Sequence, residues 1–226
     1  MAKKQRILVV GLGVLGESIA RELQLSGAEV IVLDDSPERI DAIKDSVGVA
    51  LVADATDRKT LLQLDLASLD AAVVCIGEQF EAAVLTTVHL VDLKIPRVVA
   101  RAHNELAADI LRKLGAHEVF FVESEMGEVI AHRVLHRNVL NEMDLGDDYK
   151  VVQARCPAPL AGRKLGDLRL PDRYDIFVVA VRGAQEGARM RRPTAETVLA
   201  EDDLLLLTGE SPNLEKFLRQ NPDPRS

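Results

Sequence analysis

The stretch ILVVGLGVLGESIA, residues 7–20, decides the fold of this chain. Its β-branched run Ile7–Val10 leads directly into Gly11-Leu12-Gly13-Val14-Leu15-Gly16, which opens a helix. The first glycine permits a tight turn, the second lets the backbone approach a pyrophosphate, and the third lets the helix pack close to the strand. The N-terminus of the helix offers free N–H groups and a partial positive charge to phosphates. The stretch therefore predicts a nucleotide-binding loop, and a glycine-rich turn without a ligand is the alternative.

The same strand–helix pattern continues through the first 122 residues. Helical stretches, among them Leu15–Leu25, Glu78–Leu93 and Leu106–Leu114, separate six short apolar runs. This alternation predicts a Rossmann-like, doubly wound parallel sheet of six strands in the α/β class. The expected strands are Ile7–Val10, Val30–Leu33, Ala50–Ala53, Ala71–Ile76, Val98–Ala100 and Val119–Val122.

The remainder of the chain has a different character. Apolar residues spaced near 3.6 predict a long helix from Glu125 to Met143, and the glycine and aspartates of Asp144–Tyr149 indicate a boundary. We therefore expect a nucleotide-binding domain over residues 1–143 and a small α+β domain over residues 144–226. The Pro-rich tail from Asn221 is expected to be disordered. Strands in the second domain are expected at Lys150–Arg155, Asp175–Gly183, Asp203–Thr208 and, weakly, Arg189–Arg192.

Composition narrows the function. The 226 residues include 36 acidic and 28 basic side chains, for a net charge of −8, with 3% aromatic residues and no Trp. An acidic, aromatic-poor chain is unsuited to nucleic acid. No apolar run approaches the roughly 18 residues of a membrane span, and no signal peptide is evident. Two cysteines make no disulfide framework. We expect a cytoplasmic protein that reaches a membrane only through a partner.

Acidic residues follow the second strand at the position of ribose recognition. Asp34 lies 18 residues after Gly16, where a carboxylate accepts hydrogen bonds from a ribose and repels the 2′-phosphate of NADP. Asp35 could share this role. Alternatively, Asp34 caps the helix that starts after Ser36.

The ends of the next three strands supply further candidates. Asp54, Ala55 and Thr56 form a loop that would pass the adenine, whereas Asp57 is expected to cap the following helix. Cys75, Ile76 and Gly77 end the fourth strand, and the glycine would admit a ribose or phosphate closely. Arg101 ends the fifth strand, where its guanidinium could pair with a phosphate or, alternatively, with Glu105.

Catalytic and metal motifs are weak by comparison. His132 and His136 share a helix face, but no third ligand is evident, so a solvated face is the favoured interpretation. No acid–base constellation is found in the roughly 80 residues after the first domain, whereas a dehydrogenase needs a domain that holds its substrate. The residues favour a nucleotide sensor over an enzyme.

These motifs, taken in order, resemble the cytosolic regulatory subunits of Trk/Ktr-type potassium uptake systems, also known as RCK domains. The resemblance is collinear over nearly the whole chain. It rests on Gly11–Gly16, Asp34, Asp54-Ala55-Thr56-Asp57, Ile76-Gly77, Ala100-Arg101-Ala102, Leu114–Val119, Glu123, Met126-Gly127, Pro159–Leu165 and Glu201–Gly209.

The resemblance implies a protein that catalyses nothing and binds ATP, ADP or NAD(H) at the glycine-rich loop. Such subunits dimerise through the nucleotide domain and form rings, often of eight, at the inner face of the membrane beneath a channel that they gate. Glu123 would lie at the dimer interface and help to hold a divalent cation. The helix 125–143 would cross to the partner subunit. Some C-terminal domains bind cyclic di-AMP, and the comparable region here is Asp175–Arg182.

The chain departs from the family pattern at two positions. Many ATP-responsive members carry Arg where this chain has Val14, which favours NAD(H). The family also often has Pro where this chain has Val122, which weakens the metal assignment at Glu123. A small NAD-dependent oxidoreductase and a regulator of a cation/proton antiporter are the rival interpretations. A redox-sensing repressor is opposed by the net charge of −8 and by the lack of a basic helix.

Overall fold

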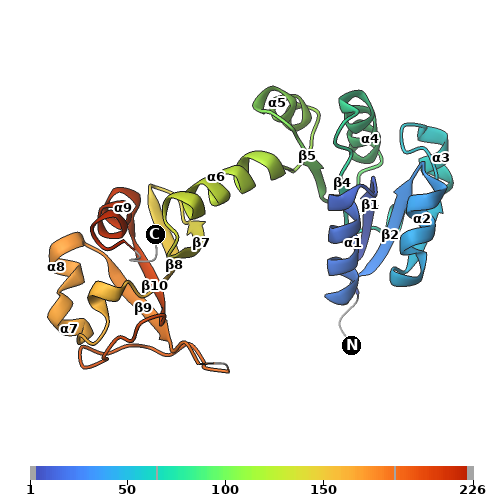
Figure 1. Ribbon diagram of the computed structural model, residues 1–226. Helices are drawn as coiled ribbons and strands as arrows, with labels where there is room; N and C mark the ends of the chain where they lie inside the picture. Colours follow the sequence, from blue (N-terminus) through green and yellow to red (C-terminus); the bar gives the residue numbers. More distant parts are fainter. Residues whose placement is uncertain (1–3, 65, 186, 223–226) are drawn as a thin grey trace. The chain divides into compact units, whose positions relative to one another are not determined.

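The computed structural model describes residues 4–64, 66–185 and 187–222 (Figure 1). Contacts within the chain divide it into two compact units, Met1–Glu123 and Ser124–Ser226. The predicted boundary, after residue 143, lies within the second of these units. The two units are described separately below.

The first unit is built on a six-stranded sheet in which all neighbouring strands are parallel, in the order β3-β2-β1-β4-β5-β6. This order has its switch point between β1 and β4, so a crevice is expected at the carboxyl ends of these strands. The predicted fold class is confirmed. The strands are β1 Arg6–Val10, β2 Glu29–Asp34, β3 Val49–Val52, β4 Ala71–Val74, β5 Val98–Arg101 and β6 Glu118–Phe120.

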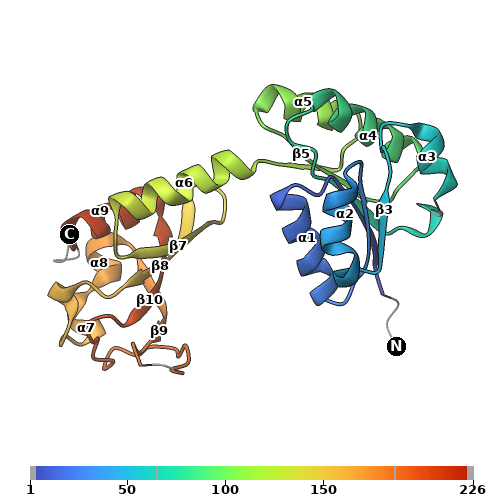
Figure 2. The same cartoon turned by 45° about the vertical axis from the view of Figure 1, so that its right-hand side comes forward.

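Helices cover both faces of this sheet (Figure 2). Leu8 and Val10 pack on one face with residues of α3, α4 and α5, whereas Val9 packs on the other with residues of α1 and α2. Burial on both faces explains why the strands are continuous apolar runs. The elements are α1 Val14–Leu25, α2 Pro37–Ile43, α3 Arg58–Gln63, α4 Phe80–Asp92, α5 Glu105–Lys113 and the short 3₁₀ turns η1 Lys44–Ser46 and η2 Leu66–Ser68.

The second unit contains a four-stranded antiparallel sheet in the order β7-β8-β10-β9. Its core gathers around Phe217, Leu205 and Ile176, which are fully buried. The strands are β7 Val139–Asp144, β8 Tyr149–Arg155, β9 Phe177–Arg182 and β10 Leu204–Glu210. The helices are α6 Val122–Leu135, which starts at the end of the first unit, η3 Ala158–Leu160, α7 Leu165–Leu168, α8 Leu170–Tyr174 and α9 Ser211–Gln220.

The predicted helix 125–143 is wrong at both ends. The helix α6 starts at Val122, so Phe121 and Val122 do not continue the sixth strand, and it ends at Leu135. Residues 139–144 form β7, which pairs with β8 through contacts such as Met143 with Val151. The apolar spacing is misleading because Val139 is buried in the core of the second unit while Val134 is exposed. Tertiary strand pairing thus overrides the local helical pattern.

Three other expectations in the second unit also change. In the segment Asp144–Tyr149, which we expected to mark a boundary, residues 145–148 form the turn that joins β7 to β8, with Gly146 and Asp147 at positive φ. Arg189–Arg192 contributes only an isolated bridge from Arg191 to Val181. Asn221 is ordered and buried, because its side chain donates to the Phe217 carbonyl. Residues 223–226 of the predicted disordered tail lie outside the described residues.

Candidate functional site

The loop between β1 and α1 is fixed by a very close backbone approach. A Cβ atom at Gly16 would lie 1.8 Å from the carbonyl oxygen of Gly11, so only glycine fits at this position of the helix. Gly11 itself has a φ of 88°, which favours glycine, and its N–H donates to the Leu33 carbonyl at 2.9 Å. The first and third glycines therefore set the turn and the helix position as predicted.

Gly13, in contrast, faces open space. A Cβ atom built on it would meet nothing within 4 Å, and it is the N-cap of α1 without any side-chain cap. The first turn of an α-helix has N–H groups without intrahelical partners. The glycine-rich loop therefore leaves the positive end of α1 open to an incoming anion.

Asp34 holds this loop from the end of β2. Its Oδ2 accepts from the Leu12 N–H at 2.5 Å, and its Oδ1 accepts from the Ser36 N–H at 2.9 Å. Its side chain is 3% exposed, and the Arg39 guanidinium lies 3.5 Å from Oδ2. The helix cap is the Ser36 side chain, which accepts from the Arg39 N–H, so the alternative role of Asp34 as the cap of α2 is wrong.

A cavity of about 770 Å³ opens at this edge of the sheet. Its volume lies within the roughly 300–1,000 Å³ typical of small-molecule sites. Two predicted site residues, Leu12 and Gly16, do not line the cavity. The Leu12 N–H donates to Asp34, and Gly16 packs on the Gly11 carbonyl. The predicted residues that line it are Gly11, Gly13, Val14, Leu15, Asp34, Asp35, Asp54, Ala55, Thr56, Cys75, Ile76, Gly77 and Arg101.

The lining includes residues that the sequence analysis did not identify. Most of them directly precede or follow a predicted residue in the chain. Their position at the carboxyl ends of the strands could therefore have indicated that they line the site. Arg39 could have been found from its place in the first turn of α2, five residues after Asp34. The additional residues are Val10, Ser18, Leu33, Arg39, Ala53, Glu78, Gln79, Ala82 and Val122.

The Arg101 guanidinium lies against Gly77 in the lining of the cavity. A Cβ atom at Gly77 would lie 2.5 Å from Nη1 of Arg101, so the glycine leaves room for the guanidinium. Nη2 of Arg101 pairs with Glu123, not with the alternative partner Glu105. Nε of Arg101 is buried and has no hydrogen-bond partner in the described part of the chain. Because this donor has almost no accessible surface, an anion in the cavity would meet the exposed part of the guanidinium instead.

Glu123 is a poor metal ligand within one chain. A hydrogen bond from its own backbone N–H, aided by the Arg101 guanidinium, lowers the pKa of its carboxyl group. The carboxylate is thus charged, but a cation already lies against it. Among residues 4–64, 66–185 and 187–222, no group of three His, Cys, Asp or Glu side chains could hold a metal. His132, which the sequence analysis considered as a metal ligand, has its Nδ1 atom 3.1 Å from Oε2 of Glu142.

The loop after β3 is ordered by its own side chains. Oδ1 of Asp54 accepts from the N–H and the hydroxyl of Thr56 at 2.8 and 2.7 Å. The Thr56 carbonyl lies 3.1 Å from Nε2 of His89 on α4. Asp57 caps α3 as predicted, and a hydrogen bond from the Lys59 N–H lowers the pKa of its carboxyl group.

Cys75 lines the cavity but is not a nucleophile at neutral pH. Burial raises the pKa of its thiol to about 12, although Arg101 acts in the opposite direction. The thiolate is the reactive form of cysteine, and it is scarce at this pKa.

Two family models match this chain. A family model described as the TrkA-N domain matches residues 7–122, and one described as the TrkA-C domain matches residues 152–220. The chain is 31% identical to Ktr system potassium uptake protein A of Bacillus subtilis over 95% of this chain and 96% of the relative. The chain belongs to the Trk/Ktr family of potassium uptake proteins. Protein C of the same Bacillus system is 30% identical over 95% of this chain and 96% of the relative.

Two solved structures share the fold of this chain. The GsuK channel has a TM-score of 0.67 at 19% identity, covering 96% of this chain and 40% of the other. A GsuK channel bound to NAD has a TM-score of 0.63 at 19% identity, again covering 96% of this chain and 40% of the other. Within residues 4–64, 66–185 and 187–222, no helix has the length and hydropathy of a membrane span.

The close approach at Gly16 generates a stability prediction. Replacement Gly16→Ala places a methyl group against the Gly11 carbonyl, so we expect a loss of about 2 kcal/mol or more, as for other overpacked sites. Helix propensity alone would predict a gain of up to about 1 kcal/mol. Urea unfolding followed by circular dichroism measures the difference. The matched variant Gly13→Ala points into open space and should cost less than about 1 kcal/mol. Equal stability of the two variants would contradict the geometry.

The buried carboxylate generates a second prediction. Asp34→Asn replaces one acceptor oxygen with an NH₂ group, so either Leu12 or Ser36 loses the acceptor for its N–H. We expect a loss of about 1–3 kcal/mol in the free energy of unfolding and weaker nucleotide binding. Asp35→Asn is the control, because Asp35 is exposed. That variant should unfold like the wild type, and an unchanged urea midpoint for Asp34→Asn would refute the assigned role of Asp34.

Proposed function

We propose that this chain is the cytosolic, nucleotide-binding regulatory subunit of a potassium uptake system and that it controls flux through a membrane partner. The open N-terminus of α1 beside Asp34, at the carboxyl edge of the parallel sheet, is the observation that carries the proposal. Membership of the Trk/Ktr family supports the transport role, because its relatives are named potassium uptake proteins.

The cavity offers separate surfaces to the two ends of an adenine nucleotide. Asp34 and Asp35 would face the ribose, and the loop Asp54-Ala55-Thr56 would pass the adenine. The N–H groups at the start of α1, around Gly13 and Val14, would hold the phosphates. The Arg101 guanidinium, which lines the same cavity, would extend this surface. Every one of these groups lies in the first unit.

The choice among ATP, ADP and NAD(H) depends on the phosphate end. Val14 is 93% exposed at the loop and brings no guanidinium there, so the cationic groups of the lining are Arg39 and Arg101. A dinucleotide, whose pyrophosphate carries less charge than a triphosphate, suits a lining in which two arginines lie among four acidic residues. A GsuK channel has been solved with NAD and GsuK has also been solved with ADP, which supports adenine nucleotides as the ligand class.

The Arg101–Glu123 pair would connect the ligand to the rest of the subunit. Val122 lines the cavity and Glu123 follows it, both in the first turn of α6. A phosphate that competes for Arg101 would release Glu123, so the start of α6 would respond to the ligand. Gating requires a ligand to bind two states unequally, by roughly 5.5 kcal/mol for a shift from 1:99 to 99:1. Several coupled copies in a ring, often of eight in this family, would share that difference.

The remaining family properties are part of the same proposal. The subunit would act without catalysis, self-associate as dimers within a ring, and reach the inner face of the membrane through its channel partner. A divalent cation would need Glu123 side chains from two subunits, because one chain supplies a single carboxylate. Cyclic di-AMP would bind near Asp175–Arg182 in the second unit. The proposed partner is a potassium channel or transporter rather than a cation/proton antiporter.

Ion flux tests the proposal directly. The chain is expressed together with the membrane subunit of a Ktr system in cells that lack both, and rubidium uptake is measured. We expect uptake to rise at least severalfold over the membrane subunit alone. Gly13→Val, whose Cβ would meet nothing within 4 Å, places a branched side chain at the open approach to α1 and should abolish this increase.

The matched control for this experiment is Val14→Ala, which removes an exposed side chain from the same loop and should keep the increase. Equal uptake with and without the chain would contradict a regulatory role. Full stimulation by Gly13→Val would show instead that regulation does not depend on the loop.

A further inference from the structure

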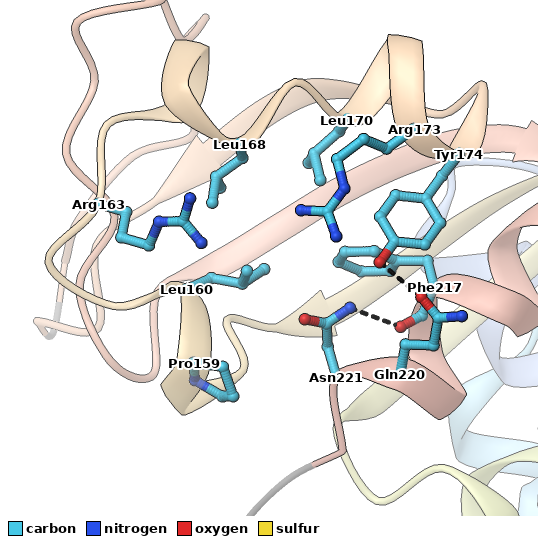
Figure 3. A pocket seen from close by; sticks show the side chains of 10 residues that line it. All are labelled: Pro159, Leu160, Arg163, Leu168, Leu170, Arg173, Tyr174, Phe217, Gln220 and Asn221. Atoms are coloured by element: carbon cyan, nitrogen blue, oxygen red, sulfur yellow. Dashed lines mark hydrogen bonds between the residues drawn. The ribbon is translucent and has the colours of Figure 1, made fainter.

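The second unit contains a hollow that the nucleotide proposal does not use. A cavity of about 200 Å³ lies among η3, α7, α8 and the end of α9 (Figure 3). This volume is below the roughly 300–1,000 Å³ of sites for drug-sized ligands, so it suits one compact molecule. Its lining is Pro159, Leu160, Arg163, Leu168, Leu170, Arg173, Tyr174, Phe217, Gln220 and Asn221.

The floor of this hollow is rigid and apolar. Leu160, Leu168 and Leu170 are each at most 4% exposed and belong to the core of the second unit. The ring of Tyr174 packs edge-on against Phe217, with centroids 5.5 Å apart. Side chains fixed in a core keep a cavity in shape without a ligand.

Polar groups at one end of the hollow are held by hydrogen bonds. The Tyr174 hydroxyl donates to Oε1 of Gln220 at 2.8 Å, and Nδ2 of Asn221 donates to the Phe217 carbonyl at 2.9 Å. Figure 3 shows both bonds beside the aromatic pair. The Tyr174–Gln220 bond links α8 to the end of α9, and the Asn221 bond closes the C-terminus of α9.

Two arginines supply the only charges of the lining. Figure 3 shows the guanidinium groups of Arg163 and Arg173 directed into the space over Leu168 and Leu160. Neither makes an ion pair with another residue that the structure describes, and no acidic residue lines the hollow. Arg173 lies 5.3 Å from the centroid of the Tyr174 ring, a cation–π contact that leaves its donors free.

Two neighbouring arginines that do not line the hollow form ion pairs with acidic residues. Arg169, four residues before Arg173, pairs with Asp172 at 2.9 Å, and Arg219 on α9 pairs with Glu215 at 3.0 Å. Carboxylates are thus available on the same helices, yet none faces the hollow. In a chain with a net charge of −8, two unpaired guanidinium groups over one apolar floor form a local positive site.

We propose that this hollow is a binding site for a compact organic anion, one carboxylate or phosphate group carried on a small apolar body. The two guanidinium groups would bind the anionic group through charge-assisted hydrogen bonds, and the leucine and aromatic floor would bind the body. The site is too small for a cyclic dinucleotide and lies in the second unit, so it is separate from the nucleotide cavity. It gives the subunit a second chemical input.

Leucine-methyl NMR of the full-length protein tests this proposal. Phenyl phosphate is the probe, and inorganic phosphate and benzyl alcohol carry its two halves separately. We expect saturable shifts of the Leu160, Leu168 and Leu170 methyl groups with phenyl phosphate, at an affinity at least about tenfold higher than with either half. The methyl groups of Leu15 and Leu33, which line the other cavity, report phosphate bound there.

Variants separate this site from general charge effects. The double variant Arg163→Gln/Arg173→Gln should weaken phenyl phosphate binding at the hollow by at least about tenfold, because charged hydrogen bonds are lost. Both residues are exposed, so the fold should persist, as the remaining methyl spectrum will verify. Arg219→Gln is the matched control on α9 and should change the affinity less than twofold.

Four results would overturn the proposal. The first is no shift of the three leucines up to the solubility limit of phenyl phosphate, and the second is undiminished binding by the double variant. The third and fourth are an affinity for benzyl alcohol or for inorganic phosphate equal to that for phenyl phosphate. None of these results depends on the nucleotide proposal, whose test uses variants of the first unit.

Discussion

The approach of α1 to β1 is the constraint on which the candidate site depends. Because a side chain at Gly16 would overlap the Gly11 carbonyl, the helix can lie at this distance only with glycine there. Asp34 then fixes the loop from the neighbouring strand by accepting from the Leu12 N–H at 2.5 Å. The sheet order places both features at its switch point, where a crevice is expected. The open helix terminus at Gly13 is therefore a consequence of packing within the first unit.

The two cavities differ in the charges of their linings. The cavity of the first unit mixes Arg39 and Arg101 with four acidic residues. In the first unit, Arg101 pairs with Glu123 yet keeps a buried donor without a partner. In the second unit, Arg163 and Arg173 face a hollow without an acidic lining residue. A net charge of −8 disfavours nonspecific binding of nucleic acid. The apolar residues left exposed on α6, such as Met126 and Ile130, fit a protein that works in an assembly.

Much of the first unit could be predicted from the sequence because its strands are buried on both faces and its glycines have one physical explanation. The cavity lining followed from the ends of the predicted strands, since parallel strands bring their carboxyl ends to one edge. The partner of Arg101 could not be predicted, because Glu123 is far away in sequence and meets it only through β5 and β6. Residues 139–144 were misassigned because the pairing of β7 with β8, not local periodicity, determines their structure. The hollow at Arg163 depends on side chains from four elements, and the motif Pro159–Leu165 supplies only part of its lining.

The most direct test of the central claim is calorimetric titration of the full-length protein with ATP, ADP, NAD and NADH. The account predicts that at least one of them binds at one site per chain, with an affinity at least about tenfold weaker in Gly13→Val, because binding depends on the open N-terminus of α1. A tighter complex with NAD or NADH than with ATP would agree with Val14 at the loop. No heat of binding from any of the four, or the same affinity in the Gly13 variant, would contradict the account.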